Sequence, residues 1–211
     1  MSTYNEIDVT CEKCGEDFRG TLWTAVHAGQ DPELKDLLLG GELNLLMCPK
    51  CGCVAYQDHF LLYQDPEIEL VAYVYPPRQK EEAAELEKTM LSGFREAQAV
   101  YPKKDRIPYD PILVFGLESL LEMLTQEDEQ AQQSLIAGYV CSENHVPYTT
   151  LRPSLARRHG LVRVIPSLDS PATTTRESVL GGMDRLLQLN PALDIYRRLR
   201  DRIQADPAWS I

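Results

Sequence analysis

The cysteines are the residues of this sequence whose type and spacing point most directly to chemistry. Two stretches, TCEKCG at residues 10–15 and MCPKCG at residues 47–52, share the template Cys-x-Lys-Cys-Gly. Two residues between the thiols let a tight turn direct both sulfurs to one point, and the glycine that follows can take a positive φ at little cost. Each turn offers two ligands, and together they complete a tetrahedral thiolate site. The predicted metal ligands are Cys11, Cys14, Cys48 and Cys51.

Zn²⁺ is the metal we predict for this site, with a structural role, because four sulfurs leave no coordination position for water or substrate. Iron is the alternative, since a rubredoxin-like centre uses the same doubled spacing and would indicate electron transfer. A redox-active pair is less favoured because no βαβ unit surrounds either Cys-x-x-Cys pair. A disulfide framework is disfavoured by the cytoplasmic location argued below.

Two further cysteines fall outside the doubled template. Cys53 could replace Cys51 as a ligand, although we expect it to pack as a small apolar side chain. Cys141 lies four residues before His145, a spacing that would suit a nucleophilic pair on a helix. We expect Cys141 to be a packing residue, and we assign no catalytic and no cofactor-binding residue.

The composition limits the classes of function. The chain has 211 residues, is 44% hydrophobic and carries a formal charge of -11, so it can bury a core but should repel phosphate backbones. The charge is uneven: -7 over residues 1–80, -8 over 81–145 and +4 over 146–211. The first ten residues lack the pattern of a signal peptide, and no apolar run approaches the length of a membrane helix. We therefore expect a cytoplasmic, acidic protein that binds no membrane.

The order of the expected elements favours an α+β fold. Residues 5–26 predict two strands joined by the first cysteine turn, and 31–39 a short helix that begins near Asp31 and ends at Gly40 or Gly41. Residues 42–65 predict a second strand pair around the second cysteine turn, and 68–77 a further strand. We accordingly predict a zinc-ribbon-like antiparallel β module over residues 5–78 and a helical region over 79–211.

Helical spacing dominates the second region. We expect a helix over 83–101 and an apolar helix face within 112–124, formed by Leu113, Leu117, Leu120 and Leu124. Another helix is expected over 126–140 with Leu135, Ile136 and Tyr139 facing inward. Residues 161–165 could form a strand. Thr174 and Glu177 fit a capping box for a helix over 175–189, and a last helix after Asn190 should bury Leu193, Tyr196, Leu199 and Ile203.

The front of the chain resembles the CpXC domain family, which is named for its Cys-Pro-x-Cys turn. The resemblance is carried by the first Cys-x-x-Cys pair, by DPELKDLLLGGELNLLMCPKCG, by LLYQDP and by IELVAYVYP, and it extends to about residue 135. The first pair departs from the pattern because Glu12 stands where proline would make a second Cys-Pro-x-Cys. The resemblance implies the same four cysteine positions and supplies no activity.

The function we expect is that of a metal-stabilised interaction or adaptor module with another protein as its partner. The alternatives are an iron-containing electron-transfer protein and an enzyme with its pocket between the β and helical parts, for which YQDP and LARRHG would be the segments to test. Recognition of nucleic acid is disfavoured by the negative charge of the front of the chain.

Overall fold

The computed structural model describes residues 1–169 and 175–209. Its strands are β1 (Thr3–Thr10), β2 (Asp17–His27), β3 (Leu45–Met47), β4 (Val54–Tyr56), β5 (Leu61–Asp65), β6 (Leu70–Tyr75), β7 (Ile112–Phe115), β8 (Tyr148–Thr150) and β9 (Val164–Pro166). Its α-helices are α1 (Pro32–Leu39), α2 (Ala83–Ala99), α3 (Leu117–Glu143), α4 (Pro153–His159), α5 (Arg176–Leu189) and α6 (Asp194–Ala205), with 3₁₀ turns at Pro77–Glu82 and Lys103–Asp105. The elements confirm the predicted α+β class.

The chain divides into two compact units, Met1–Thr125 and Gln126–Ile211. This division differs from the predicted one, which began the helical region at residue 79. The reason is that the chain returns to the first sheet after α2: β7 pairs in parallel with β6, a connection that requires a crossover of the kind α2 provides. The first unit therefore contains α2, β7 and the beginning of α3.

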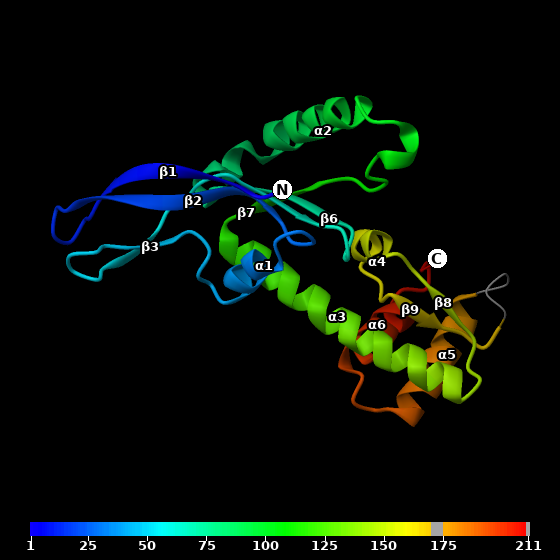
Figure 1. Cartoon of the computed structure of the whole chain (residues 1–211). Coiled ribbons are helices and arrows are strands. Elements are labelled where there is room, and N and C mark those ends of the chain that lie inside the picture. The colour runs from blue at the N-terminus through cyan, green and yellow to red at the C-terminus, as the bar shows by residue number, and fades with distance from the viewer. Residues whose placement is uncertain (170–174, 210–211) are drawn as a thin grey trace. The chain divides into compact units, whose positions relative to one another are not determined.

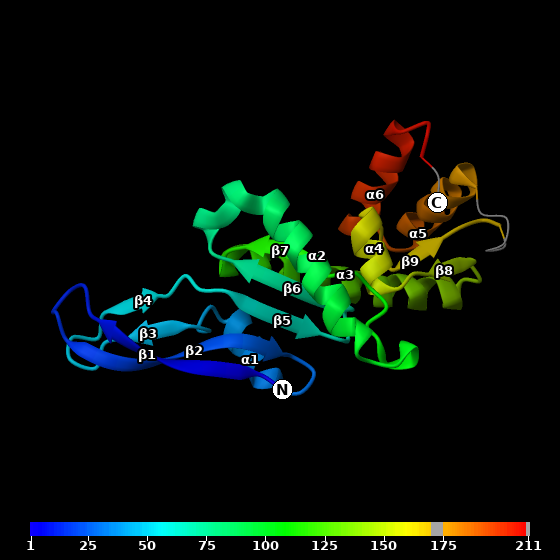
Figure 2. The same ribbon diagram turned by 90° about the horizontal axis from the view of Figure 1, so that it is seen from above.

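A five-stranded mixed sheet in the order β1-β2-β5-β6-β7 forms the frame of the first unit. Strands β1 and β2 are antiparallel, β2 and β5 parallel, β5 and β6 antiparallel. In Figure 1, α2 lies on one side of this sheet, and α1 and the first turns of α3 lie on the other. The separate pair β3 and β4 forms a second small sheet beside the β1–β2 hairpin (Figures 1 and 2).

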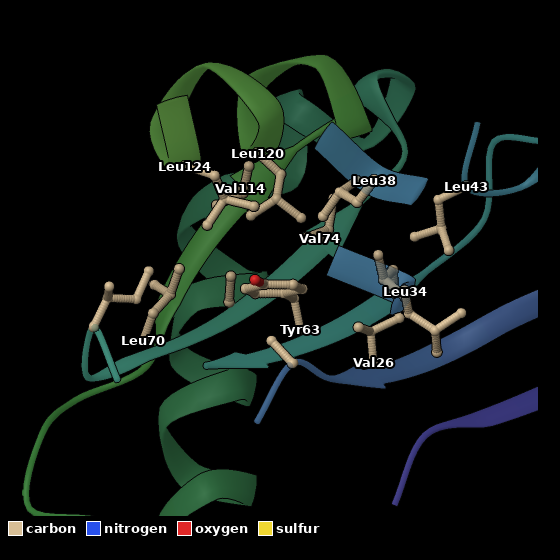
Figure 3. Packing of buried hydrophobic residues seen from close by; sticks show 14 residues of the cluster. Val26, Leu34, Leu38, Leu43, Tyr63, Leu70, Val74, Val114, Leu120 and Leu124 are labelled. Carbon is tan, nitrogen blue, oxygen red and sulfur yellow. The ribbon is translucent and has the colours of Figure 1, made fainter. Parts of the chain in front are cut away.

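The core of the first unit lies between the sheet and the helices α1 and α3. In β5 the side chains alternate between buried and half-buried, which places Tyr63 on the covered face, whereas β6 is buried along most of its length. Figure 3 shows Leu34 and Leu38 of α1 and Leu120 and Leu124 of α3 gathered around Tyr63. Burial of such side chains contributes about 1.5–3 kcal/mol each before entropy is counted.

Helices α1 and α2 confirm their predictions with one difference in capping. Asp31 occupies the N-cap position of α1, but its side chain makes no capping hydrogen bond. Instead its carboxylate accepts from the backbone N–H of Ser2 at 3.1 Å. Hydrogen bonds from Ser2 favour the charged form of this carboxylate and lower its pKa. In α2 the fully buried stripe is limited to Met90 and Phe94.

The apolar run at residues 112–124 is one strand followed by one helix, not a single helix face. Leu113 lies in β7, and the chain turns into α3 at Gly116, where φ is +85°. Leu120 and Leu124 face the core as predicted, with Leu117 packed against it. A short buried strand and a buried helix have the same apolar composition, so periodicity over four residues could not separate them.

The second unit contains the rest of α3, the antiparallel strands β8 and β9 with α4 between them in sequence, and α5 and α6. Its core includes the predicted stripe of the last helix, Leu193, Tyr196, Leu199 and Ile203. Helix α5 begins after Thr175, whose side chain accepts from the backbone N–H of Ser178 at 3.2 Å, as an N-cap residue does. The predicted cap at Thr174 lies outside the described residues.

The predicted inward face of the helix over 126–140 is wrong. Leu135, Ile136 and Tyr139 are 77%, 44% and 68% exposed, whereas Ala137 and Cys141 are fully buried. The helix instead turns Ala137 and Cys141 to the core, on the side where a Cβ added to Gly138 would lie 3.7 Å from Val164 of β9. The covered face therefore carries smaller side chains than the predicted one.

An ion-pair cluster and a close backbone approach add to this core. Glu127 is buried and its carboxylate accepts from Arg157 at 2.6 Å and from Arg163 at 2.7 Å. In α5, a Cβ on Gly182 would lie 2.5 Å from the backbone of Ser167, so only glycine permits this approach of the helix to the chain after β9.

Among the described residues, no helix has the combined length and hydrophobicity that crossing a membrane requires.

Candidate metal centre

The two cysteine turns are the tips of two β-hairpins. The first turn joins β1 to β2, whose strands pair from Thr10 with Asp17 onward. The second joins β3 to β4, which pair from Met47 with Val54. Figure 1 shows the two hairpins side by side at the edge of the first unit.

The two turns have the same backbone hydrogen bonds, as their shared template predicts. In the first, the N–H of Gly15 donates to the carbonyl of Cys11 at 2.8 Å, and in the second the N–H of Gly52 donates to that of Cys48 at 2.9 Å. The φ angles of the two glycines are +69° and +66°. Both lie in the left-handed region that suits glycine best. Each turn therefore needs glycine after the second cysteine.

The four predicted sulfurs lie together, all within 4.8 Å of one another. The Sγ atoms of Cys11 and Cys51 are 3.6 Å apart, and those of Cys14 and Cys48 are 3.7 Å apart. A tetrahedron with metal–sulfur bonds of about 2.3 Å has sulfurs about 3.8 Å apart, whereas a disulfide requires about 2.05 Å. All four cysteines are free thiols, so their arrangement fits a metal ion and not a covalent link.

The local environment shifts the pKa values of Cys11 and Cys14 in opposite directions. A hydrogen bond from the backbone N–H of Cys14 lowers the pKa of Cys11 to about 6. The backbone N–H of Glu16 acts to lower the pKa of Cys14, but burial and the three neighbouring thiols outweigh it and raise that pKa to about 12. Four thiolates in this space need a cation, because like charges this close oppose each other's ionisation.

The hairpins also contact each other away from the sulfurs. Lys50 of the second turn pairs with Glu16 of the first at 2.7 Å. This partly exposed pair contributes at most about 1 kcal/mol. Beneath the turns, Leu46 of β3 lies against Gly20 of β2, where an added Cβ would come within 2.8 Å of its side chain. The close approach of β3 to β2 therefore depends on a residue without a side chain at position 20.

Asn44 positions the second hairpin from its base, a role that sequence reasoning missed. Its side-chain oxygen accepts from the backbone N–H of Trp23 at 2.7 Å, and its side-chain nitrogen donates to the carbonyl of Trp23 at 3.0 Å. The residue is 5% exposed and its φ is 60°. Asparagine tolerates this conformation better than most residues do. The signal was present in GELNLL, where a lone polar residue with turn propensity precedes an apolar strand.

The other cysteines lie apart from the cluster. Cys53 belongs to the second turn, yet its sulfur is not one of the four and lies 4.0 Å from the carbonyl oxygen of Val54. Cys141 is fully buried in the core of the second unit, where burial raises its pKa to about 11. That environment is typical of a packing residue, since a nucleophilic thiol requires a lowered pKa.

The two segments named as enzyme candidates take part in ion pairs. Asp65 of YQDP is buried and accepts from Lys35 of α1 at 2.9 Å, from the backbone N–H of Glu67 and from the hydroxyl of Tyr63. Arg157 of LARRHG binds Glu127. These side chains hold helices to their neighbours.

Two hairpin tips with a Cys-x-x-Cys-Gly turn each, and with four sulfurs in one cluster, define a protein able to bind a metal through cysteines. The family comparison agrees: the family model of the CpXC proteins matches residues 9–136. The chain belongs to the CpXC protein family, which confirms the resemblance seen in the sequence. Neither the curated proteins nor the solved structures contain a significant match.

Proposed function

We propose that Cys11, Cys14, Cys48 and Cys51 bind one structural Zn²⁺ ion and that the module it stabilises mediates binding to another protein. The clustering of the four sulfurs within 4.8 Å, at the tips of hairpins separated by a helix in sequence, supports the proposal most strongly. Four thiolates fill the tetrahedral coordination of zinc, so the ion has no position for a substrate and serves the fold.

The small size of the second hairpin supports a structural role. Strands β3 and β4 have three residues each, and an isolated two-stranded hairpin is marginally stable at best in water. Structural zinc supplies about 10–16 kcal/mol of apparent binding free energy in small domains, and this energy stabilises the folded state. Zinc would therefore fix the β3–β4 hairpin against β2.

Metal analysis of the purified chain with a visible spectrum tests the zinc assignment. We expect one equivalent of zinc per chain and no visible absorption. One equivalent of iron with strong visible absorption would overturn the zinc assignment and support electron transfer instead.

A matched pair of variants tests the ligand set. Cys48→Ser removes a sulfur of the cluster and should abolish stoichiometric zinc, with faster hydrogen exchange in β3 and β4. Cys53→Ser removes the neighbouring thiol outside the cluster and should leave one equivalent bound. Loss of zinc from the Cys53 variant would show that the ligand set is wrong.

The binding role is tested by comparing proteins cross-linked to the zinc-loaded chain with those cross-linked to the Cys48→Ser variant. We expect a partner that requires the intact module. Identical sets from the two chains would contradict a role for the module in binding.

A further inference from the structure

The first unit contains a pocket of about 400 Å³ beside the β3–β4 hairpin. Its apolar lining includes Leu38 and Leu43, which are buried, and Leu117 and Leu121 at the start of α3. This volume lies within the range of ligand-binding pockets in proteins, which are mostly apolar with a few polar groups. The pocket is large enough for a bulky apolar side chain.

The charged side chains that line the pocket are all acidic. Asp58 and Glu118 line it with exposed carboxylates, and among its described lining residues there is no lysine, arginine or histidine. Within the described part of the chain, neither carboxylate pairs with a cation. An occupant with positive charge beside its apolar part would match this lining.

An exposed apolar face of the β3–β4 hairpin adjoins the pocket. The register pairs Met47 with Val54 and Leu45 with Tyr56, so the four side chains share one face of the small sheet. Met47, Val54 and Tyr56 are 67%, 51% and 57% exposed, and Tyr56 also lines the pocket. The surface is therefore longer than the pocket itself.

We propose that the pocket and this hairpin face together bind an extended segment of a partner protein, in which a large apolar side chain is flanked by lysine or arginine. The inference rests on the proposed binding role and names the chemistry of its partner. The pocket receives the apolar side chain, the hairpin face covers the neighbouring residues, and Asp58 and Glu118 attract the basic ones.

The length and the charge of the surface favour this occupant over two others. A small molecule that filled the pocket would leave the hairpin face exposed. A second copy docked through the same surface would bring its own acidic patch against Asp58 and Glu118, because a two-fold interface joins identical patches. Carboxylates facing carboxylates oppose such a dimer.

Amide chemical shifts of the zinc-loaded full chain, titrated with short synthetic peptides, test the proposal. The basic peptides carry leucine, phenylalanine or tryptophan between pairs of lysine and arginine. One control replaces the basic residues by glutamate, and the other replaces the apolar core by glycine and serine. We expect saturable shifts at residues 41–47, 54–58 and 116–121 with the basic apolar peptides alone.

Charge reversal supplies a second readout. The double variant Asp58→Lys with Glu118→Lys should lower the affinity for the basic peptides roughly tenfold, since two favourable charge pairs become repulsive. The same variant should bind the glutamate peptides. Glu85→Lys with Glu87→Lys, two exposed reversals on α2, changes the net charge equally and should leave affinity unchanged.

Several results would overturn the proposal: no saturable shifts with any basic apolar peptide, equal shifts with either control peptide, or shifts confined to other residues. Shifts of these amides that grow with protein concentration alone would assign the surface to a second copy. Zinc content is measured in the same samples, so failed peptide binding with one zinc retained rejects this inference and leaves the structural zinc site standing.

Discussion

Replacement of Asn44 offers the sharpest test of how the β3–β4 hairpin is anchored. Its carboxamide makes two hydrogen bonds to the backbone of Trp23 and is almost fully buried. Each bond contributes about 1 kcal/mol net, and a buried backbone group left without a partner costs about 1–3 kcal/mol. Asn44→Gly should therefore cost about 2–3 kcal/mol of unfolding free energy. Asn44→Ala should cost about 1 kcal/mol more, because alanine is strained at the positive φ of this position.

Hydrogen exchange under native conditions is the suitable assay, because the chain has two units and a single unfolding transition cannot be assumed. Protection in β2 and β3 should fall by the stated free energies while zinc stays at one equivalent. Asn5→Ala, at an exposed site in β1, is the control. An exposed substitution of this kind should change protection by about 0.5 kcal/mol at most. If Asn44→Gly leaves protection within that margin, the carboxamide does not anchor the hairpin.

Three further predictions concern the second unit. Burial raises the pKa of Cys141 from 9.0 to about 11, so the unfolded chain binds fewer protons between these values. Stability should then fall by roughly 2–3 kcal/mol as the pH rises through this interval. In urea unfolding of Cys141→Ala, the transition of the second unit should show a smaller fall in stability, and a fall equal to that of the unchanged chain would contradict this role of Cys141. Glu127→Gln should lower the unfolding free energy of the second unit by about 3–5 kcal/mol, measured in urea, because it removes the buried carboxylate that two half-buried guanidinium groups share. Asp194→Asn breaks an exposed ion pair, and this loss should lower the unfolding free energy by about 0.5 kcal/mol or less. Equal losses for Glu127→Gln and Asp194→Asn would refute the role of burial. Gly182→Ala should lower the thermal midpoint of unfolding, because the added Cβ meets backbone. Gly181→Ala should lower it less, because its Cβ meets only an exposed leucine side chain that can move. A raised midpoint for Gly182→Ala would show that the helix shifts freely.

The features that the sequence predicted well depend on local chemistry. A Cys-x-x-Cys-Gly turn needs its spacing and its glycine regardless of the rest of the fold, so the positions of Cys11, Cys14, Cys48 and Cys51 at two hairpin tips followed from the sequence. The stripe of α6 followed from helical spacing in the same way. Both signals lie within about fifteen residues, the range over which propensity and periodicity act.

The features that the sequence did not predict depend on long-range contacts. Leu135 and Tyr139 have the hydrophobicity of core residues, but the core of the second unit lies on the side of α3 that carries its small residues. The pairing of β7 with β6 joins segments about forty residues apart, which no local pattern reveals. The role of Asn44 likewise required the position of Trp23, a strand earlier in the chain.

The proposed zinc site and the proposed docking surface are physically connected. A hairpin of this size normally gains stability by turning its apolar side chains inward, yet Met47, Val54 and Tyr56 face solvent. Leu46 is the fully covered side chain of β3 and packs against Gly20. If the thiolate–zinc bonds supply the stability that burial would otherwise provide, the outer face of the hairpin is free to serve a partner. Zinc removal should then abolish peptide binding at the hairpin face, although no peptide contact to the metal is required.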